Sequence, residues 1–393
     1  MKIGAAGAAG EQAKPLIGLV LAEIQTQLGP DPADLGFLFV TDHFADEIPA
    51  LVEQIQNTTG ALHLLGCTGE SVIGPTREYE NTPSLSLWMA RLPGVRLESF
   101  YLSPDEISRC GSETACKSSI PAVDPSKSKL IMLSDPFTTD IAALFGGINQ
   151  FFPGCLTVGG MASALDGPGR NVLIHNGRLR RQGTVGVAIT GAVEIATVVS
   201  QGCRPIGQPL LISKSDRNII HQLGAKPPLE VINELYHSLS QRDRHLLAQG
   251  LFVGRVIDEY QQEFRRGDFL IRNLMDADQE SGAIAVMDQV ETGTTIQFHV
   301  RDSESADEDL RALLALHAAP PPAGALLFSC NGRGTHLFPD PDHDVTVTRE
   351  VFGPVPVAGF FCAGEFGPVG GKNFIHGHTA SLALFRPAGQ PGN

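Results

Sequence analysis

The feature that most constrains this chain is an apolar run that breaks into a loop of small residues, Leu326-Leu327-Phe328-Ser329-Cys330-Asn331-Gly332-Arg333-Gly334. The apolar residues predict a buried strand, and the five positions from Cys330 to Gly334 then offer a thiol, an amide, a guanidinium and two glycine backbones. Glycine lets a backbone approach a ligand closely, and arginine presents a planar fork of donors to a carboxylate or phosphate. The stretch therefore predicts either a ligand-binding loop or a tight structural turn with a solvated arginine and a core cysteine.

A similar pattern occurs earlier in the chain, where residues 63–70 carry an apolar run into Gly66-Cys67-Thr68-Gly69-Glu70. Each of the two patterns is followed by a second glycine-rich strand end, at residues 153–163 and 355–365, and then by a short apolar segment that ends in histidine. The repeated order predicts two related lobes, residues 1–217 and 218–393, whose strand-end loops face a shared or paired cleft.

Composition excludes several classes of protein. The 393 residues are 42% hydrophobic and 18% charged, which is typical of a globular protein with room for two cores. The balance of 29 basic against 43 acidic residues gives a net charge of −14, which disfavours nucleic acid or an anionic membrane as a partner. The seven cysteines form no CxxC pair, and no apolar run approaches the ~20 residues of a membrane span. We therefore expect a soluble cytoplasmic protein with reduced thiols.

The order of helical and strand patterns predicts an α/β (α+β) fold. Residues 16–28 and 47–57 have the periodicity of amphipathic helices, and short buried strands follow each of them. A hairpin signal at Asn176-Gly177 opens an antiparallel set, and a second antiparallel set is expected between residues 251 and 300. The expected architecture is two pseudo-repeated lobes of antiparallel-rich sheets flanked by helices, stacked as an αββα-type sandwich. The tail from about residue 387 is expected to be disordered.

Several of these motifs, in this order, resemble the FIST sensory domain. The similarity to the N-terminal half of that domain lies in residues 66–74 and in Ser200-Gln201-Gly202-Cys203-Arg204-Pro205-Ile206-Gly207. The similarity to its C-terminal half lies in three segments: Phe328 to Gly334, residues 355–368 with Gly364-Glu365-Phe366-Gly367-Pro368, and His376-Gly377-His378-Thr379-Ala380. The resemblance covers roughly residues 15 to 386.

The resemblance implies a ligand-sensing input module of signal transduction rather than an enzyme. Family members look like small-molecule binders, with amino acids as suspected ligands, and some bind haem and respond to nitric oxide. The sequence contains no recognisable kinase, cyclase, methyl-accepting or F-box segment. We therefore expect a stand-alone sensor that reports to a separate signalling protein, such as a kinase or cyclase.

The first hypothesis for the site is a pocket for a small polar ligand. Arg333 would pair with a ligand carboxylate, while Glu365 would meet an ammonium group or hold Arg333 in place. The alternative is that Arg333 and Glu365 form only an internal ion pair. The candidate ligand-binding residues are Cys67, Glu70, Cys330, Asn331, Gly332, Arg333, Gly334, Gly364, Glu365, His376 and His378.

Two other chemistries remain open from the sequence. A cysteine-dependent hydrolase or transferase would use Cys330 or Cys67 as nucleophile and His376 or His378 as base. A metal site could use the same two histidines. A haem site is also open, although the sequence has no CxxCH motif and no convincing axial histidine, and no cofactor is expected. Further metal ligands could come from the segment with His336, Asp340, Asp342, His343 and Asp344, which is more simply interpreted as an exposed loop before a helix.

Overall fold

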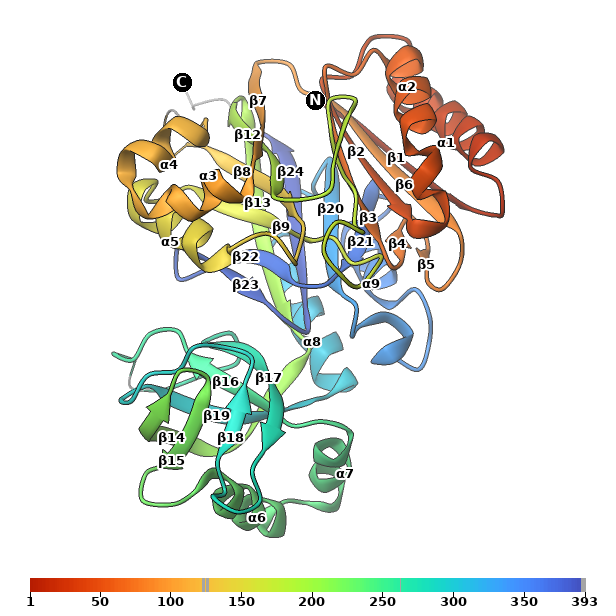
Figure 1. Cartoon of the computed structure of the whole chain (residues 1–393). Helices are drawn as coiled ribbons and strands as arrows, with labels where there is room; N and C mark the ends of the chain where they lie inside the picture. Colours follow the sequence, from red (N-terminus) through yellow and green to blue (C-terminus); the bar gives the residue numbers. More distant parts are fainter. Residues whose placement is uncertain (122–123, 125–126, 262, 390–393) are drawn as a thin grey trace. The chain divides into compact units, whose positions relative to one another are not determined.

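The structure is a computed structural model that describes residues 1–121, 124, 127–261 and 263–389. The chain divides into two compact units (Figure 1). Unit 1 comprises Met1–Val199, Leu310–Ile375 and Thr379–Asn393, and unit 2 comprises Ser200–Asp309 and His376–His378. The predicted lobe boundary at residues 217 and 218 lies inside unit 2, so the compact units and the predicted lobes divide the chain differently.

Unit 1 is built on three six-stranded sheets. The first contains, in spatial order, β1 (Lys2–Ala9), β6 (Ser84–Arg91), β2 (Leu35–Thr41), β3 (His63–Gly69), β10 (Leu173–His175) and β11 (Arg178–Arg180). The second contains β23 (Lys372–His376), β22 (Glu365–Val369), β9 (Leu156–Met161), β8 (Lys129–Ser134), β12 (Thr184–Gly191) and β7 (Val95–Leu102). The third contains β13 (Val193–Gln201), β24 (Thr379–Pro387), β20 (Gly324–Cys330), β21 (Val357–Cys362), β4 (Val72–Ile73) and β5 (Glu78–Tyr79).

Each sheet of unit 1 has a parallel pair of strands joined by a helix at its centre. The pairs are β2–β3, β8–β9 and β20–β21, and the other neighbour of each of these six strands is antiparallel to it. The connecting helices are α2 (Ile48–Thr59), α5 (Ile141–Phe151) and α9 (His343–Phe352). Because parallel strands need a crossover connection, each helix covers one face of its own sheet. The carboxyl ends of the strands in a pair then lie at one edge of that sheet.

The core of unit 1 follows from the alternation of side chains along these buried strands. On β2, Phe37 and Phe39 enter a central core, while Leu38 and Val40 pack under α1 (Ala13–Leu28) and α2. The first strands of the other two pairs alternate in the same way, since Ile131, Leu133, Leu326 and Phe328 also enter the central core. The strands of the pairs are nearly continuous apolar runs because both faces are buried.

The predicted α/β class, with antiparallel-rich sheets flanked by helices, is confirmed. The first and third sheets share the central core, with α1 and α2 packed on the outer side of the first sheet. The outer side of the third sheet packs against α9 and the end of α8 (Ser303–Ala315). That arrangement has the expected αββα order, and the second sheet completes the core with α3 (Pro104–Ser108), α4 (Glu113–Ser119) and α5 on its own outer side.

Unit 2 is a closed barrel with two helices of its own. The strands, in order around the barrel, are β14 (Cys203–Asp216), β15 (Ile219–Leu223), β18 (Ile284–Val286), β17 (Phe269–Ala277), β16 (Phe252–Val256) and β19 (Thr295–Arg301). The helices α6 (Pro228–Ser238) and α7 (Gln241–Gln249) contribute partly buried leucines to the barrel core. Unit 2 also contains the beginning of α8.

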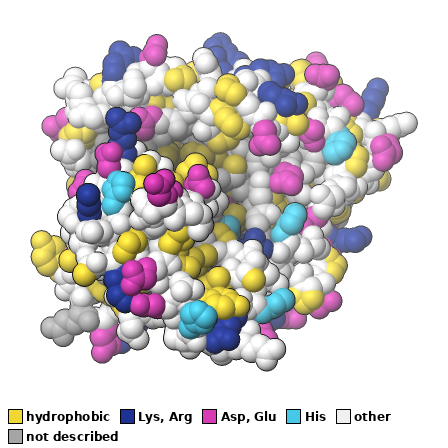
Figure 2. Space-filling model, turned by 60° about the horizontal axis from the view of Figure 1, so that its bottom comes forward, with side chains coloured by type: hydrophobic (Ala, Val, Ile, Leu, Met, Phe, Trp, Pro, Cys, Tyr) yellow, Lys and Arg dark blue, Asp and Glu magenta, His cyan; other side chains and the backbone are white. Residues whose placement is uncertain are grey.

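Two general features bear on function. No helix in the described part of the chain has the length and apolar character needed to cross a membrane. Figure 2 shows charged side chains of both signs dispersed over one face, with hydrophobic side chains gathered in patches between them. The tail from about residue 387 was predicted to be disordered. Pro387 is the last residue of β24, and residues 390–393 lie outside the described residues.

Candidate functional site

Ends of strands from all three sheets of unit 1 meet around Ser163, which follows β9. The Ser163 hydroxyl accepts a hydrogen bond from the backbone N–H of Glu70 at 3.0 Å and donates one to the carbonyl of Phe361. The backbone N–H of Ser163 donates to the carbonyl of Thr68 at 3.3 Å, so β3, β9 and β21 are tied together at their carboxyl ends. Sequence patterning predicted these strand ends, and the structure brings those of β3, β9 and β21 together.

A glycine of β9 makes this close approach possible. Gly160 pairs with Glu365 across the β9–β22 ladder, and a Cβ added at Gly160 would lie 2.4 Å from Cys362 Sγ and 3.2 Å from the carbonyl of Gly364. Real Cβ atoms essentially never come within 3 Å of another heavy atom. Any other residue at this position would therefore require Cys362 to shift.

Arg333 is fully buried, and Asp344 at the start of α9 holds it in a bidentate ion pair. The guanidinium Nε donates to Asp344 Oδ2 at 2.8 Å and Nη2 donates to Oδ1 at 2.7 Å. The same carboxylate accepts a hydrogen bond from the Ser329 hydroxyl at 2.7 Å and lies 2.9 Å from Nδ1 of His343. Burial opposes ionisation of Asp344, but the charge and hydrogen bonds of Arg333 outweigh it and hold the pKa of this carboxyl well below its usual range.

This pairing limits what Arg333 can offer to a ligand. Nε and Nη2 are committed to Asp344, and Nη1 is buried with no hydrogen-bond partner. Arg333 was expected to present a fork of donors to a ligand carboxylate. Because Nε and Nη2 are already used, only the Nη1 group remains available for that contact. The interpretation of residues 340–344 as an exposed loop was wrong for Asp344, which is 1% exposed.

Glu365 is a second fully buried charged residue, at the start of β22. Its Oε2 accepts hydrogen bonds from the Thr379 backbone N–H at 3.1 Å and from the Thr379 hydroxyl at 2.7 Å. Its Oε1 accepts no hydrogen bond of normal geometry. Burial raises the pKa of Glu365 to about 8, and the Thr379 hydrogen bonds, the charge of Arg333 and the nearby Cys330 thiol reduce this rise only in part. At neutral pH the carboxyl is mostly protonated.

Three cysteines, Cys67, Cys330 and Cys362, lie near one another at these strand ends, and Cys330 and Cys362 also lie close to Glu365. Cys330 and Cys362 are register partners on β20 and β21, and Cys67 on β3 belongs to the same central core as Cys362. Burial raises the pKa of the Cys67 thiol well above its ordinary value. Burial also raises the pKa of Cys362, with further contributions from Glu365 and the other two cysteines. Cys67 and Cys362 are therefore protonated thiols, which are poor nucleophiles.

The loop after β20 reaches the surface beside a pair of acidic residues from the first half of the chain. The carboxylate of Glu80 accepts hydrogen bonds from the Thr335 backbone N–H at 3.0 and 3.1 Å and from the Thr335 hydroxyl at 2.7 Å. Gly334 has a positive φ of 54°, and a Cβ there would lie 2.6 Å from Glu80 Oε2. Glu70 is exposed nearby, where partial burial raises its pKa and the charge of His336 opposes that rise.

The predicted ligand residues are thus divided between the two units. Unit 1 holds nine of them, Cys67, Glu70, Cys330, Asn331, Gly332, Arg333, Gly334, Gly364 and Glu365. His376 and His378 belong to unit 2, where the His378 ring packs on Phe252 with centroids 4.4 Å apart and Nε2 lies 2.9 Å from Asn273 Oδ1. Within the described residues, no group of three or more histidine, cysteine or acidic side chains is arranged to hold a metal ion.

Sequence reasoning missed Glu80 and Ser163 as parts of this site, and it considered Asp344 only as a possible metal ligand and not as the partner of Arg333. Asp344 has one detectable signal, since an acidic residue in the first turn of a helix is favoured there whether or not it faces inward. Ser163 and Glu80 gave no signal, because their roles depend on contacts with residues 198 and 255 positions away in the chain.

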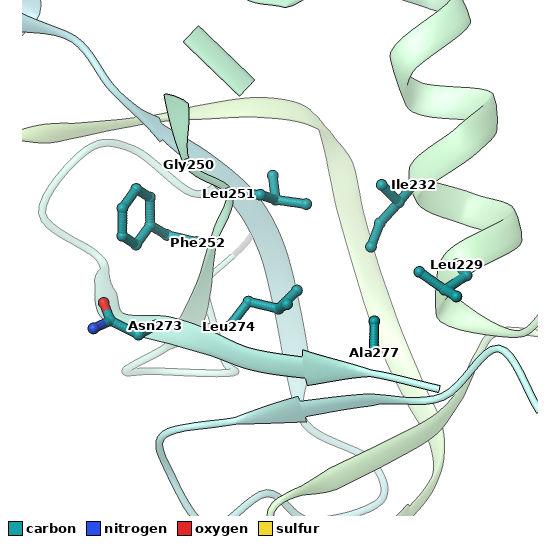
Figure 3. A pocket seen from close by; sticks show the side chains of 8 residues that line it. All are labelled: Leu229, Ile232, Gly250, Leu251, Phe252, Asn273, Leu274 and Ala277. Atoms are coloured by element: carbon teal, nitrogen blue, oxygen red, sulfur yellow. The ribbon is translucent and has the colours of Figure 1, made fainter. Parts of the chain in front are cut away.

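A separate groove lies in unit 2 and contains none of the predicted site residues. It has a volume of about 470 Å³ and lies between α6 and the strands β16 and β17. Figure 3 shows the side chains of Leu229 and Ile232 from α6 pointing toward those of Leu251, Leu274 and Ala277. The groove is largely apolar and offers Asn273 as a polar side chain.

Two family models and several relatives match most of this chain. The model of the FIST N domain matches residues 34–226, and that of the FIST C domain matches residues 228–368. The uncharacterized protein Rv0628c of Mycobacterium tuberculosis is 36% identical over 98% of this chain and 100% of its own length. The uncharacterized protein Mb0898c of Mycobacterium bovis is 38% identical over 89% of each chain. Among solved structures, a cyanuric acid hydrolase from A. caulinodans matches 98% of this chain and all of its own, with 8% identity and a TM-score of 0.36, which is too low to establish a shared fold.

Proposed function

Because the chain belongs to the FIST family, whose domains are sensory domains, we propose that it senses a small polar ligand and passes the signal to a separate partner protein. The ligand binds in unit 1 at the carboxyl ends of β3, β20 and β21, beside the start of β22. The partner is a signalling protein of the kinase or cyclase kind.

One observation carries this proposal. Three polar atoms at these strand ends have no hydrogen-bond partner, Arg333 Nη1, Glu365 Oε1 and Asn331 Oδ1. Arg333 and Glu365 are fully buried and lie close enough for the charge of one to influence the pKa of the other. A buried polar group without a partner costs about 1–3 kcal/mol, so three of them together need a compensating interaction. A bound ligand supplies that interaction.

The unpartnered atoms favour an amino-acid-like zwitterion as the ligand. Nη1 of Arg333 can donate to one carboxylate oxygen, while Glu365 Oε1 and Asn331 Oδ1 can accept from an ammonium group. Each hydrogen bond to a charged group contributes about 1.5–3 kcal/mol, enough to fix the orientation of a small molecule. Glycine at positions 332, 334 and 364 leaves room for the backbone to approach the ligand.

The test is a screen of amino acids and related zwitterions by thermal shift, followed by calorimetry with any ligand found. A ligand at 100 times its Kd stabilises the folded state by about 2.7 kcal/mol, which is a measurable shift. The variants Glu365→Gln and Asn331→Ala should each weaken binding at least tenfold. Asp135→Asn is the matched control, since Asp135 is another buried carboxylate of unit 1 with one unpartnered oxygen. Equal affinity in Glu365→Gln, Asn331→Ala and the control would remove these residues from the site.

A second candidate is a thiol-dependent activity at Cys330. Cys330 is 9% exposed, whereas Cys67 and Cys362 are fully buried, and the Gly332 N–H donates to Cys330 Sγ at 3.4 Å. A backbone donor and a neighbouring arginine are typical of the surroundings of reactive cysteines. Rapid alkylation of Cys330 by iodoacetamide at pH 7, lost in Cys330→Ser, would support this activity. An inert thiol would exclude it. A Soret band in the same preparation would indicate the third possibility, a haem-based sensor.

A further inference from the structure

Another groove, in unit 1, lies beside the hairpin formed by β10 and β11. The groove has a volume of about 470 Å³, within the range of small-molecule sites. Its lining includes Tyr101, Thr138, Gly169, Arg180, Arg181 and Gln182, and we call it the arginine groove. The sequence Arg178-Leu179-Arg180-Arg181 at this position is more simply interpreted, from the sequence alone, as a solvated hairpin tip.

The arginines of this hairpin have no acidic partner. The chain carries 43 acidic against 29 basic residues, yet no ion pair within the described part of the chain involves Arg178, Arg180 or Arg181. In a chain with such an excess of acidic side chains, these neighbouring unpaired guanidiniums form a local positive charge that can attract an anion.

Arg180 is held in place by the groove rather than extended into solvent. Its guanidinium lies over the ring of Tyr101, 4.3 Å from the centroid, and its Nε is buried without a hydrogen-bond partner. Arg181 is anchored by one donor, since its Nη1 donates to the carbonyl of Gly169 at 3.2 Å. Two guanidiniums are thus positioned at one groove with most of their donors unused.

Thr138 also lines the groove, but its hydrogen bonds are made within the chain. Its hydroxyl donates to Oδ2 of the buried Asp135 at 2.7 Å, and the same Oδ2 accepts from the Phe137 N–H at 3.2 Å. The Thr138 oxygen accepts from the Gly183 N–H at 2.9 Å. Because its single O–H is donated to Asp135, Thr138 has no donor left for a ligand, and an anion would be bound by the donors of Arg180 and Arg181.

We propose that the arginine groove binds a small phosphorylated molecule, with the phosphate group held by Arg180 and Arg181. Two guanidiniums match the double negative charge and the several acceptor oxygens of a phosphate better than they match a single carboxylate. The remainder of the ligand would lie along the groove toward Gln182. This site is separate from the proposed zwitterion site, and neither depends on the other.

The experiment measures pyrophosphate binding to the full-length protein by calorimetry at constant ionic strength, with sulfate as a second anion. The wild type should bind pyrophosphate saturably and more tightly than sulfate. Arg180→Gln and Arg181→Gln should each weaken pyrophosphate binding at least tenfold, and Arg180→Lys should give an intermediate loss because it keeps the charge but not the planar fork. The matched control is Arg96→Gln, which removes one positive charge from an exposed pair with Glu98.

Several outcomes would overturn the proposal. Absence of saturable binding by the wild type at millimolar pyrophosphate would exclude the site, as would equal binding of sulfate. An equal loss in Arg96→Gln would assign the effect to net charge rather than to the groove. Because Arg180 packs on Tyr101, its variant could fail to fold; the exposed Arg181 then decides the question, and unchanged affinity in Arg181→Gln refutes the assignment.

Discussion

The buried carboxyl of Glu365 should make the stability of unit 1 depend on pH, and Glu365→Gln should remove that dependence. Burial raises the pKa of Glu365 from about 4.5 to about 8. Between these two values the folded state holds a proton that the unfolded state has lost. The stabilisation from this group is therefore fully present below pH 4.5 and is lost as pH rises through 8. Glutamine has the same shape and cannot ionise.

The size of the effect follows from the two pKa values. Over the range from pH 6 to pH 9 the unfolded carboxyl is ionised throughout, while the folded carboxyl changes from mostly protonated to mostly ionised. Linkage then gives a loss of about 2.5 kcal/mol in the free energy of unfolding of the wild type relative to Glu365→Gln. Because Glu365 is fully buried, no reduction for solvent screening is needed.

The single tryptophan provides the assay. Trp88 is fully buried in the central core of unit 1, so its fluorescence reports the unfolding of that unit. Urea titrations of the wild type and Glu365→Gln at pH 6, 7, 8 and 9 give the difference in unfolding free energy at each pH. Parallel pH profiles would refute the reasoning, because they would mean that Glu365 is ionised in the folded state at pH 6.

Three further predictions concern the same strand ends. Binding of an ammonium-bearing ligand at pH 7 should release about 0.9 proton from Glu365, because a carboxyl with a pKa of about 8 is mostly protonated before the ammonium group arrives. Calorimetry in buffers of different ionisation enthalpy would reveal the released proton. Identical heats in all buffers would contradict an ammonium contact at Glu365. Asp344→Asn should destabilise unit 1 by about 3–5 kcal/mol, because it leaves Arg333 buried without a counter-charge, and a loss under 1 kcal/mol in urea denaturation would be incompatible with the ion pair described. Gly334→Ala should destabilise more than Gly370→Ala, since both have a φ near 55° but only the Cβ at Gly334 would meet a carboxylate, at 2.6 Å; equal losses in thermal melts would show that the contact is unimportant.

Much of this fold could be predicted because its strands are buried on both faces. Runs such as Phe37 to Val40 and Leu326 to Phe328 are apolar without interruption, and small residues follow where each strand reaches the edge of its sheet. The helices over residues 13–28 and 48–59 were expected within a few residues of their bounds, because their apolar stripes have a clear helical period. The sequence pattern was sufficient to predict those strands and helices whose buried residues form a continuous apolar run or recur with a helical period.

The rest depended on contacts that no local pattern contains. The expectation that Arg333 would face a ligand carboxylate did not include Asp344, because the intervening segment is polar and proline-containing and resembles a surface loop. In the structure α9 begins at His343, which turns Asp344 inward against Arg333. The role of a charged residue in a buried site depends on its tertiary partners. Residue type and spacing therefore singled out Arg333 but could not predict its ion pair with Asp344.

The three strand–helix–strand pairs also explain why the proposed site is asymmetric. Of their second strands, β21 ends in Cys362, β3 carries Cys67 two residues before its last residue, and β9 carries Gly159-Gly160 just before its last residue, Met161. Two of these strand ends therefore contribute a thiol, and the third allows a close approach of the backbone. Glycine at that third end lets β22 pair closely with β9, which brings Glu365 next to Cys362 and within electrostatic reach of Arg333. Arg333 Nη1 and Glu365 Oε1 are left there as buried polar atoms without a hydrogen-bond partner, and they are the atoms through which the proposed ligand would be held.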